Sequence, residues 1–255
     1  MSLTRWYDEH GRHDLPWRET LDPWAILVSE VMLHQTQVPR VAAVFEGFLA
    51  RFPTPEAMAA ASAGDVITAW GRLGYPRRAR RLWEAAGVIA RDGWPEDLTE
   101  LPGVGRYTAA AVRAQAEDAD LPAIEVNIRR VVERVEGRRL TEREAEAAMV
   151  KVGRPLHGRD RLLALMDVGA LLCRPRDPRC GECPLRRRCA TRGALPDETR
   201  SRQARFEGSF RQRRGRVMAV LREGPARADA LDAEALASLV TDGLAVVDGA
   251  TATLP

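Results

Sequence analysis

The sequence contains very little lysine and asparagine, and it has no long apolar run. Lys151 is the only lysine among 39 basic residues, and Asn127 is the only asparagine. No apolar segment approaches the length of about eighteen residues that a membrane-spanning helix needs, which argues against a membrane span. The charged N-terminal segment MSLTRWYDEHGRHDLPWR lacks the apolar stretch of a signal peptide, so the sequence predicts a cytoplasmic protein.

The rest of the composition is that of an ordinary globular protein. Apolar residues make up 45% of the 255 residues, which is enough to bury a sizeable core in one large domain or two ordinary ones. The net charge of +3 hints at acidic partners. Arginine presents a planar fork that suits phosphate, so the preference for arginine over lysine fits a phosphate-rich partner. A GC-rich genome would enrich arginine in the same way, and both explanations stay open.

Apolar residues with helical spacing run through most of the chain. They recur at intervals of three and four, between prolines that lie at segment boundaries. Strand-like alternation is absent until the last fifty or so residues, and we find no repeat. The pattern therefore predicts an all-α body, with helices around Ile26–Met32 and Val41–Leu49 and over 56–62, 64–72, 78–91, 107–116, 124–136, 142–153 and 159–172.

The C-terminal part of the chain differs from this helical body. A polar stretch over 190–216 contains eight arginines outside the cysteine region: Arg192, Arg200, Arg202, Arg205, Arg211, Arg213, Arg214 and Arg216. The pattern then predicts a helix over 210–223, a turn, a second helix over 232–242, and the short alternating runs LAVVD and ATATLP. Helices followed by a small hairpin resemble a winged-helix module. The alternative is a short appendage that only packs on the body.

All four cysteines fall within seventeen residues, at Cys173, Cys180, Cys183 and Cys189, with the spacing C-x6-C-x2-C-x5-C. A cytoplasmic protein rarely keeps disulfides, so clustered thiols indicate a metal site. Zinc ribbons usually need two close Cys-x2-Cys pairs, and here only the middle pair is that close. Single cysteines around one tight pair suit a 4Fe–4S cluster, whose four irons each take one thiolate. The spacing therefore favours a 4Fe–4S cluster, with zinc as the alternative.

Residues 101–112, LPGVGRYTAAAV, have the signature of a helix–hairpin–helix turn. Gly103 and Gly105 can adopt the positive φ that turns the chain sharply. Their amides, together with the N-terminus of the helix that contains Tyr107, would form a nest for a phosphodiester without reading any base. An ordinary helix–helix turn with a glycine stop is the alternative.

A carboxylate follows this hairpin at the start of an amphipathic helix. Glu125 lies shortly after Pro122 and two residues before Asn127. A glutamate at a helix N-terminus is often only a cap, so the pattern allows either a structural or a functional carboxylate.

Taken together, these segments resemble the helix–hairpin–helix DNA glycosylases that carry an iron–sulfur cluster, the endonuclease III superfamily, and within it the MutY-type adenine DNA glycosylases. The resemblance covers about residues 5–190. The motifs that carry it occur in family order: LPWR at 15–18, SEVMLHQTQV at 29–38, WGRLGYPRRARRL at 70–82, LPGVGRYTAAAV, the Glu125–Val131 segment and the cysteine set.

The resemblance implies a DNA base-excision repair N-glycosylase. Such an enzyme flips a mispaired base out of double-stranded DNA and removes it by hydrolysis, here adenine opposite 8-oxoguanine or guanine. It implies a monomer that acts at the nucleoid and binds a 4Fe–4S cluster through Cys173, Cys180, Cys183 and Cys189. The reacting adenine needs a proton donor, and the sugar needs a negative charge beside it.

The resemblance also implies how the chain is divided. We expect a six-helix barrel over 23–125, which contains the helix–hairpin–helix, and an iron–sulfur cluster domain over 126–190, with a cleft between these two helical subdomains. The N-terminal segment 1–22 would join the cluster domain, and a linker over 191–208 would lead to the winged-helix-like tail over 209–255. This tail does not resemble the Nudix-like domain with which typical members read 8-oxoguanine.

Residue roles carry over by motif. Glu30 matches the general acid that protonates adenine, and Glu125 lies where the family has its catalytic aspartate. Tyr107 and Asn127 match polar groups at the reacting sugar. Gln35 and Tyr75 match residues wedged into the DNA stack. The remaining residues expected to contact DNA are His34, Gly103, Gly105, Arg106 and Arg18.

The sequence departs from the family pattern at three of these motifs. Glu125 in place of aspartate moves the carboxylate by about 1 Å, which is a costly shift in a preorganised site. His34 replaces a glutamine beside the wedge, and Pro76 replaces a second tyrosine. The chain could therefore be a slow adenine glycosylase, a glycosylase retuned to another lesion, or a catalytically weak damage-binding protein. A lyase of the endonuclease III type would need a lysine where Tyr107 stands.

Overall fold

The computed structural model describes residues 1–196, 198 and 205–255. Two arginines of the polar stretch, Arg200 and Arg202, and part of the expected linker lie outside the described residues. No described helix is long and apolar enough to cross a lipid bilayer.

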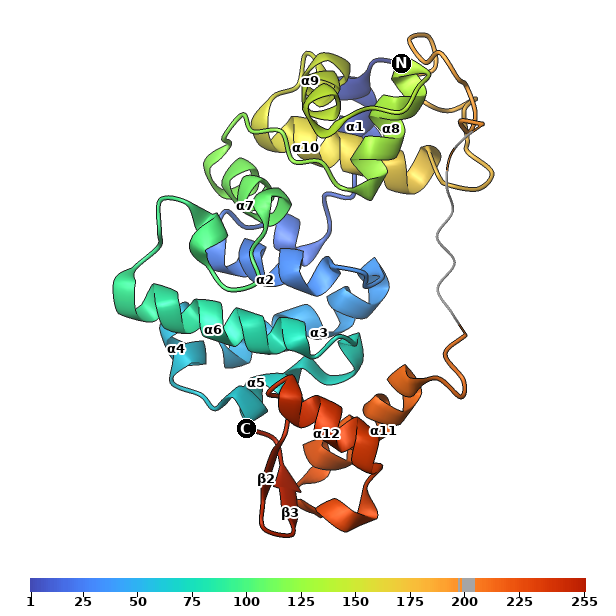
Figure 1. Cartoon of the computed structure of the whole chain (residues 1–255). Helices are drawn as coiled ribbons and strands as arrows, with labels where there is room; N and C mark the ends of the chain where they lie inside the picture. The colour runs from blue at the N-terminus through green and yellow to red at the C-terminus, as the bar shows by residue number, and fades with distance from the viewer. Residues whose placement is uncertain (197, 199–204) are drawn as a thin grey trace. The chain divides into compact units, whose positions relative to one another are not determined.

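The described chain is mostly helical, as predicted, with a few short strands near its C-terminus (Figure 1). The α-helices are α1 (Leu3–His10), α2 (Pro23–Leu33), α3 (Val38–Arg51), α4 (Pro55–Ala59), α5 (Ala63–Trp70), α6 (Arg77–Asp92), α7 (Arg106–Glu117), α8 (Val126–Glu136), α9 (Glu142–Gly153), α10 (Gly158–Asp167), α11 (Phe210–Glu223) and α12 (Ala233–Thr241). The strands are β1 (Ala226–Arg227), β2 (Val246–Asp248) and β3 (Thr251–Thr253). Helix α8 begins two residues later than expected because Glu125 is its N-cap.

The chain divides into two compact units, and each is discontinuous in sequence. The first unit comprises Met1–Glu30 and Val104–Arg200, and the second comprises Val31–Gly103 and Ser201–Pro255. The units divide within α2 and again inside the predicted hairpin.

In the first unit, α10 packs against α1, α7, α8 and α9. The core between them is apolar and includes Trp6, Val131, Met149 and Leu165, all of which are at most 1% exposed. The start of α9 is fixed by a capping box in which Thr141 and Glu144 satisfy each other's backbone N–H groups. Helix α10 continues into a π-helix over Val168–Leu172, which delivers the chain to the first cysteine.

In the second unit, α6 packs against α4 and α5, and an aromatic cluster of Phe48, Phe52 and Trp70 lies among the helices. The C-terminal tail belongs to this unit. Its helices α11 and α12 pack together, and its strands form an antiparallel sheet in the order β1-β3-β2. The tail is held to α5 by a hydrogen bond of 2.6 Å from the Gly64 N–H to the Pro255 carbonyl.

Two arginines of the tail are occupied by ion pairs inside the tail itself. Arg213 on α11 pairs with Asp232 and Glu234 at the start of α12, and Arg214 pairs with Asp242 at its end. These guanidinium groups hold the two helices together. Both side chains therefore serve packing within the tail.

Candidate functional site

Glu30 is a buried carboxyl near the end of an almost entirely apolar helix, α2. It is 3% exposed. The hydroxyl of Tyr107 donates to its Oε2 at 3.0 Å, and the side-chain amide of Gln115 donates to its Oε1 at 2.7 Å. Burial raises the pKa of Glu30, although the two hydrogen bonds oppose the shift. A carboxyl with a raised pKa is suited to hold a proton and give it away.

Tyr107 and Gln115 both come from α7, about two turns apart. Gln115 is 1% exposed and was not identified from the sequence. A signal for it existed: it follows Thr108, Ala111 and Val112 at helical spacing on the buried face of α7. A polar side chain on an otherwise buried stripe needs a partner, because leaving its amide unpaired would cost free energy.

Glu125 caps α8 with both carboxylate oxygens. Its Oε2 accepts from the backbone N–H of Asn127 at 2.8 Å and from the Asn127 amide at 2.9 Å, while Oε1 accepts from the Ile128 N–H at 2.8 Å. Burial raises the pKa of Glu125, and these donors together with the charge of Arg130 oppose the rise. The cap and a catalytic role are compatible, because a capping carboxylate keeps its charge in a fixed place.

Asn127 is tied in turn to the segment that leads to the cysteines. Arg130 donates to the Asn127 Oδ1 at 2.6 Å, to the Gly169 carbonyl at 2.8 Å and to the Cys173 carbonyl at 2.6 Å. Gly169 allows this close approach, since a Cβ there would lie 2.7 Å from the Asn127 Cβ. One guanidinium thus connects the Glu125–Asn127 cap with the π-helix and the first cysteine.

Arg18, which the sequence predicts to contact DNA, makes its contacts in this structure within the protein. Its guanidinium is buried and donates to both oxygens of Asp167, at 2.6 and 2.9 Å. The backbone and side chain of Arg12 donate to the same carboxylate. Burial opposes the ionisation of Asp167, but the hydrogen bonds and charges of Arg18 and Arg12 lower its pKa overall. Arg18 therefore anchors the N-terminal segment to α10.

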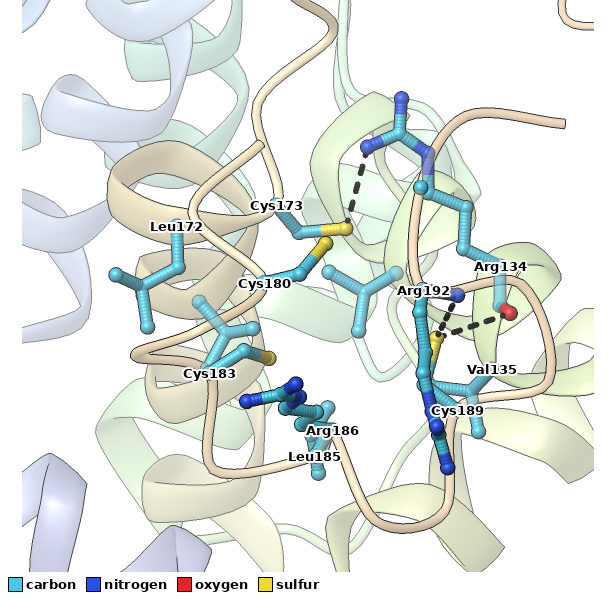
Figure 2. A pocket seen from close by; sticks show the side chains of 13 residues that line it. Arg134, Val135, Leu172, Cys173, Cys180, Cys183, Leu185, Arg186, Cys189 and Arg192 are labelled. Atoms are coloured by element: carbon cyan, nitrogen blue, oxygen red, sulfur yellow. Dashed lines mark hydrogen bonds between the residues drawn. The ribbon is translucent and has the colours of Figure 1, made fainter. Parts of the chain in front are cut away.

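The four cysteines line one pocket together with apolar side chains such as Val135, Leu172 and Leu185 (Figure 2). Among the described residues, no group of three or more His, Cys, Asp or Glu side chains is placed to hold a metal ion. Cys173, Cys180, Cys183 and Cys189 thus form one set of thiols around a single pocket, and cysteine thiolates are metal ligands.

Donors around these thiols also fit a negatively charged cluster. The guanidinium of Arg134 lies 3.5 Å from the Cys173 Sγ, and the Arg192 N–H donates to the Cys189 Sγ at 3.3 Å (Figure 2). Arg134 is fixed by a two-pronged ion pair with Glu198. Hydrogen bonds to cysteine sulfurs stabilise the charge that thiolate ligands carry.

The predicted hairpin has one positive-φ glycine and not two. Gly103 has φ +81°, and a Cβ there would lie 2.7 Å from the Arg81 Cβ, so two constraints require glycine. Gly105 has an extended backbone, φ −97° and ψ 174°, and is the N-cap of α7. Because glycine has no side chain to accept a hydrogen bond from the first turn of α7, the N–H groups of that turn stay available for an anion. Arg106, at the first helical position, is largely exposed and pairs with Glu146.

The two predicted wedge residues, Gln35 and Tyr75, share an unusual backbone conformation. Both are exposed, and both have positive φ, at 57° and 49°. Such values are uncommon for non-glycine residues and concentrate at functional sites. His34 precedes Gln35, and its burial together with the nearby charge of Arg78 lowers its pKa.

Arg78, which was not identified from the sequence, holds both of these turns. It donates to the carbonyls of His34 and Gly74, at 2.5 and 3.0 Å, and its guanidinium lies 5.3 Å from the centre of the Tyr75 ring. Burial lowers the pKa of Arg78 to about 10. A single half-buried cation therefore fixes the backbone just before each of the two wedge candidates.

Comparison with known proteins agrees with the family resemblance. Residues 28–155 match the HhH-GPD family model, described as the HhH-GPD superfamily of base excision DNA repair proteins. The chain is 44% identical to the adenine DNA glycosylase of Mycobacterium tuberculosis strain H37Rv, over 97% of this chain and 91% of that protein.

Two solved structures are similar in fold. The structure of a thermostable thymine-DNA glycosylase matches with a TM-score of 0.65 and 30% identity, over 74% of this chain and 92% of that one. A non-covalent complex of endonuclease III with DNA matches with a TM-score of 0.63 over the same shares of the two chains. At 21% identity, the second likeness shows the fold alone.

Proposed function

The chain belongs to the HhH-GPD superfamily of base excision DNA repair proteins and is a DNA glycosylase, and from this premise we propose that it removes adenine mispaired with 8-oxoguanine or guanine. One observation carries the proposal of mechanism. A buried carboxyl, Glu30, and a second carboxylate, Glu125, both belong to the first unit, and the charge of Glu125 contributes to the raised pKa of Glu30. Two carboxyl groups with different environments are what hydrolysis of a glycosidic bond requires.

Glu30 is the proton donor in this scheme. Adenine leaves the sugar readily only when its ring is protonated, so a carboxyl with a raised pKa is needed beside it. Burial supplies that shift in the pKa of Glu30. The base reaches the carboxyl only after it has been flipped out of the duplex.

Glu125 is the negative charge beside the sugar. As the bond to adenine breaks, positive charge develops on the sugar, and a fixed carboxylate stabilises it in the transition state. The three donors that cap α8 hold this carboxylate in place. Tyr107 and Asn127 support one carboxyl group each, through their hydrogen bonds to Glu30 and Glu125.

We expect hydrolysis without strand cleavage because the hairpin helix has Tyr107 where a lyase would need a lysine amine. A lyase reaction needs a lysine that forms a Schiff base with the sugar. Lys151 is the only lysine, and it lies exposed on α9, where it pairs with Glu136 at 3.0 Å. The residue in the hairpin is Tyr107, whose burial raises its pKa well above the usual range.

The groups that we assign to DNA contacts do not distinguish one base from another. We assign the backbone around Gly103 and the N-terminus of α7 to a phosphate, with Arg106 beside it. Gln35 and Tyr75 enter the base stack, where their fixed backbone conformation keeps them from folding back. The enzyme acts as a monomer on double-stranded DNA.

We assign a 4Fe–4S cluster to Cys173, Cys180, Cys183 and Cys189. The cluster supplies no chemical step in base removal; when bound, it fixes the arginine-rich loop that its ligands delimit. Purified protein should absorb near 400 nm and contain about four irons per chain, because a cubane has four irons. A chain that contains one zinc and almost no iron would overturn the assignment.

The substrate is tested by a screen of duplexes. Each carries adenine, thymine or a common lesion opposite each possible base, and free bases are identified by mass. We expect adenine from adenine·8-oxoguanine and adenine·guanine pairs. Thymine is the second candidate, because a thymine-DNA glycosylase structure is similar at 30% identity. Release of thymine without adenine would replace the proposal, and tight mismatch binding without any base release would indicate a damage-binding protein.

A further inference from the structure

The amide of Gln115 is placed to decide which oxygen of Glu30 carries the proton. Its Nε2 lies 2.7 Å from the Glu30 Oε1, and the two side chains are 1% and 3% exposed. An ionised carboxylate only accepts hydrogen bonds, so the donor end of the amide faces it. Once Oε1 is occupied by an N–H group, a proton on Glu30 belongs on Oε2, which faces the Tyr107 hydroxyl.

We propose that Gln115 is a positioning residue for base removal, which holds Glu30 so that Oε2 is the oxygen that delivers the proton to the leaving base. This inference rests on the proposed role of Glu30 as general acid. It adds that the orientation of the acid is set from α7 by a side chain that does not touch the substrate. Tyr107 accepts the hydrogen bond of the protonated Oε2 until the flipped base replaces it as acceptor.

The same contact sets the pH range in which Glu30 is an acid. The groups that face Glu30 are Gln115 and Tyr107 from α7, Glu125 from the start of α8, and Arg18 from the N-terminal segment. The amide of Gln115 favours the ionised carboxylate and lowers its pKa against the effect of burial. Removing the amide therefore raises the pKa, and the rate loss at high pH should occur at a higher pH.

The test is a series of substitutions that change the amide and keep the length of the side chain. Gln115→Met removes the donor, and single-turnover release of adenine from an adenine·8-oxoguanine duplex is followed from pH 5 to 9. We expect the descending limb of the rate profile to move up by about one pH unit. The plateau rate should fall about tenfold, since the carboxyl is no longer held.

A second variant and a control separate positioning from packing. Gln115→Glu places a like charge against Glu30 and should move the limb further upward than methionine does. Val112→Ala is the control, because Val112 is equally buried on α7 but has no polar atom. It should lower the melting temperature and leave the limb where it is in the unmodified enzyme.

The outcomes distinguish this inference from the proposed function. If the unmodified enzyme releases no adenine, the proposed function fails and no profile exists. If it releases adenine and the descending limb of the rate profile lies at the same pH in both Gln115 variants as in the unmodified enzyme, the amide only fills space and the inference is overturned. A limb that moves to lower pH in Gln115→Met would show that the amide oxygen faces Glu30, which also overturns it. Duplex affinity, measured in parallel, should not change.

Discussion

Replacing Glu125 by asparagine separates its two roles, because asparagine caps a helix as well as a carboxylate does but has no charge. Glu125→Gln keeps the side-chain length, but glutamine and asparagine alike put an NH2 group where one carboxylate oxygen now accepts a hydrogen bond. Asparagine is chosen because aspartate, which has the same shape and keeps the charge, is available as its control. Glu125→Asp keeps both the cap and the charge and is the matched control. Comparison of Glu125→Asn with Glu125→Asp therefore isolates the effect of the charge.

The expected magnitudes differ greatly for the two roles. A lost N-cap costs about 1 kcal/mol, or roughly 2–4 °C in melting temperature for a chain of this size, and asparagine should avoid most of that loss. Loss of a charge that stabilises a transition state costs about 10²- to 10³-fold in rate. Glu125→Asn should therefore melt within a few degrees of the unmodified protein and release adenine about 10²- to 10³-fold more slowly.

The pH profile gives an independent reading of the same variant. The charge of Glu125 raises the pKa of Glu30, so its removal should lower that pKa. The descending limb of base release would then move to lower pH, opposite to the shift expected for Gln115→Met. A single-turnover assay on adenine·8-oxoguanine duplexes measures both rate and limb.

The result that would refute this reasoning is an unimpaired Glu125→Asn variant. Full activity with an unshifted limb would make Glu125 only a helix cap. Glu125→Asp then distinguishes two accounts of the departure from the family. A faster release of adenine would mean that glutamate is a handicap in an adenine glycosylase, and a slower release on another substrate would mean that the longer side chain is an adaptation.

Three further predictions concern Glu30, Asp167 and Cys183. Glu30→Gln should abolish adenine release and yet melt at a higher temperature than the unmodified protein at pH 8 in calorimetry. Burial raises the pKa of Glu30 above its ordinary 4.5, so its contribution to stability is present below pH 4.5 and lost as pH rises through the folded-state value. The variant should therefore lose its advantage in acid. Asp167→Asn leaves Arg12 and Arg18 without their counter-charge and should lower the free energy of unfolding in urea by about 3–5 kcal/mol. A loss below about 1 kcal/mol would mean that these ion pairs do not stabilise the fold. Cys183→Ser should lose both the absorbance near 400 nm and most of its affinity for duplex DNA. Retention of this affinity without iron would show that DNA binding does not depend on the cluster.

Local patterns in the sequence predicted what depends on neighbours along the chain. The helices from α4 to α10 lie close to the ranges expected from apolar spacing, and the tail has the expected order of two helices and a hairpin. The burial of Glu30 agrees with the apolar helix in which it stands. The motif roles of Glu125 and Asn127 fit a helix start, where capping geometry is local.

What the sequence did not predict are pairings between distant segments. Gln115 and Glu30 are 85 positions apart, and Arg18 and Asp167 are 149 apart. Nothing in the local pattern says which arginine of such an arginine-rich chain forms contacts within the protein, so neither the ion pair of Arg18 with Asp167 nor the hydrogen bonds of Arg78 were predicted. The sequence also could not say which glycine of the hairpin adopts positive φ, because a glycine that permits this conformation does not require it.

The interleaving of the two units has a consequence for synthesis of the chain. Trp6 and Tyr7 are buried against helices that include α10, and Arg12 meets Asp167 across 155 positions. At about 5–20 residues per second, a ribosome needs about 8–30 s to deliver those partners after α1 has emerged. During that time the apolar face of α1 has nothing native to cover it. The first helix should therefore be a binding site for nascent-chain chaperones, and its docking should be a late event in folding.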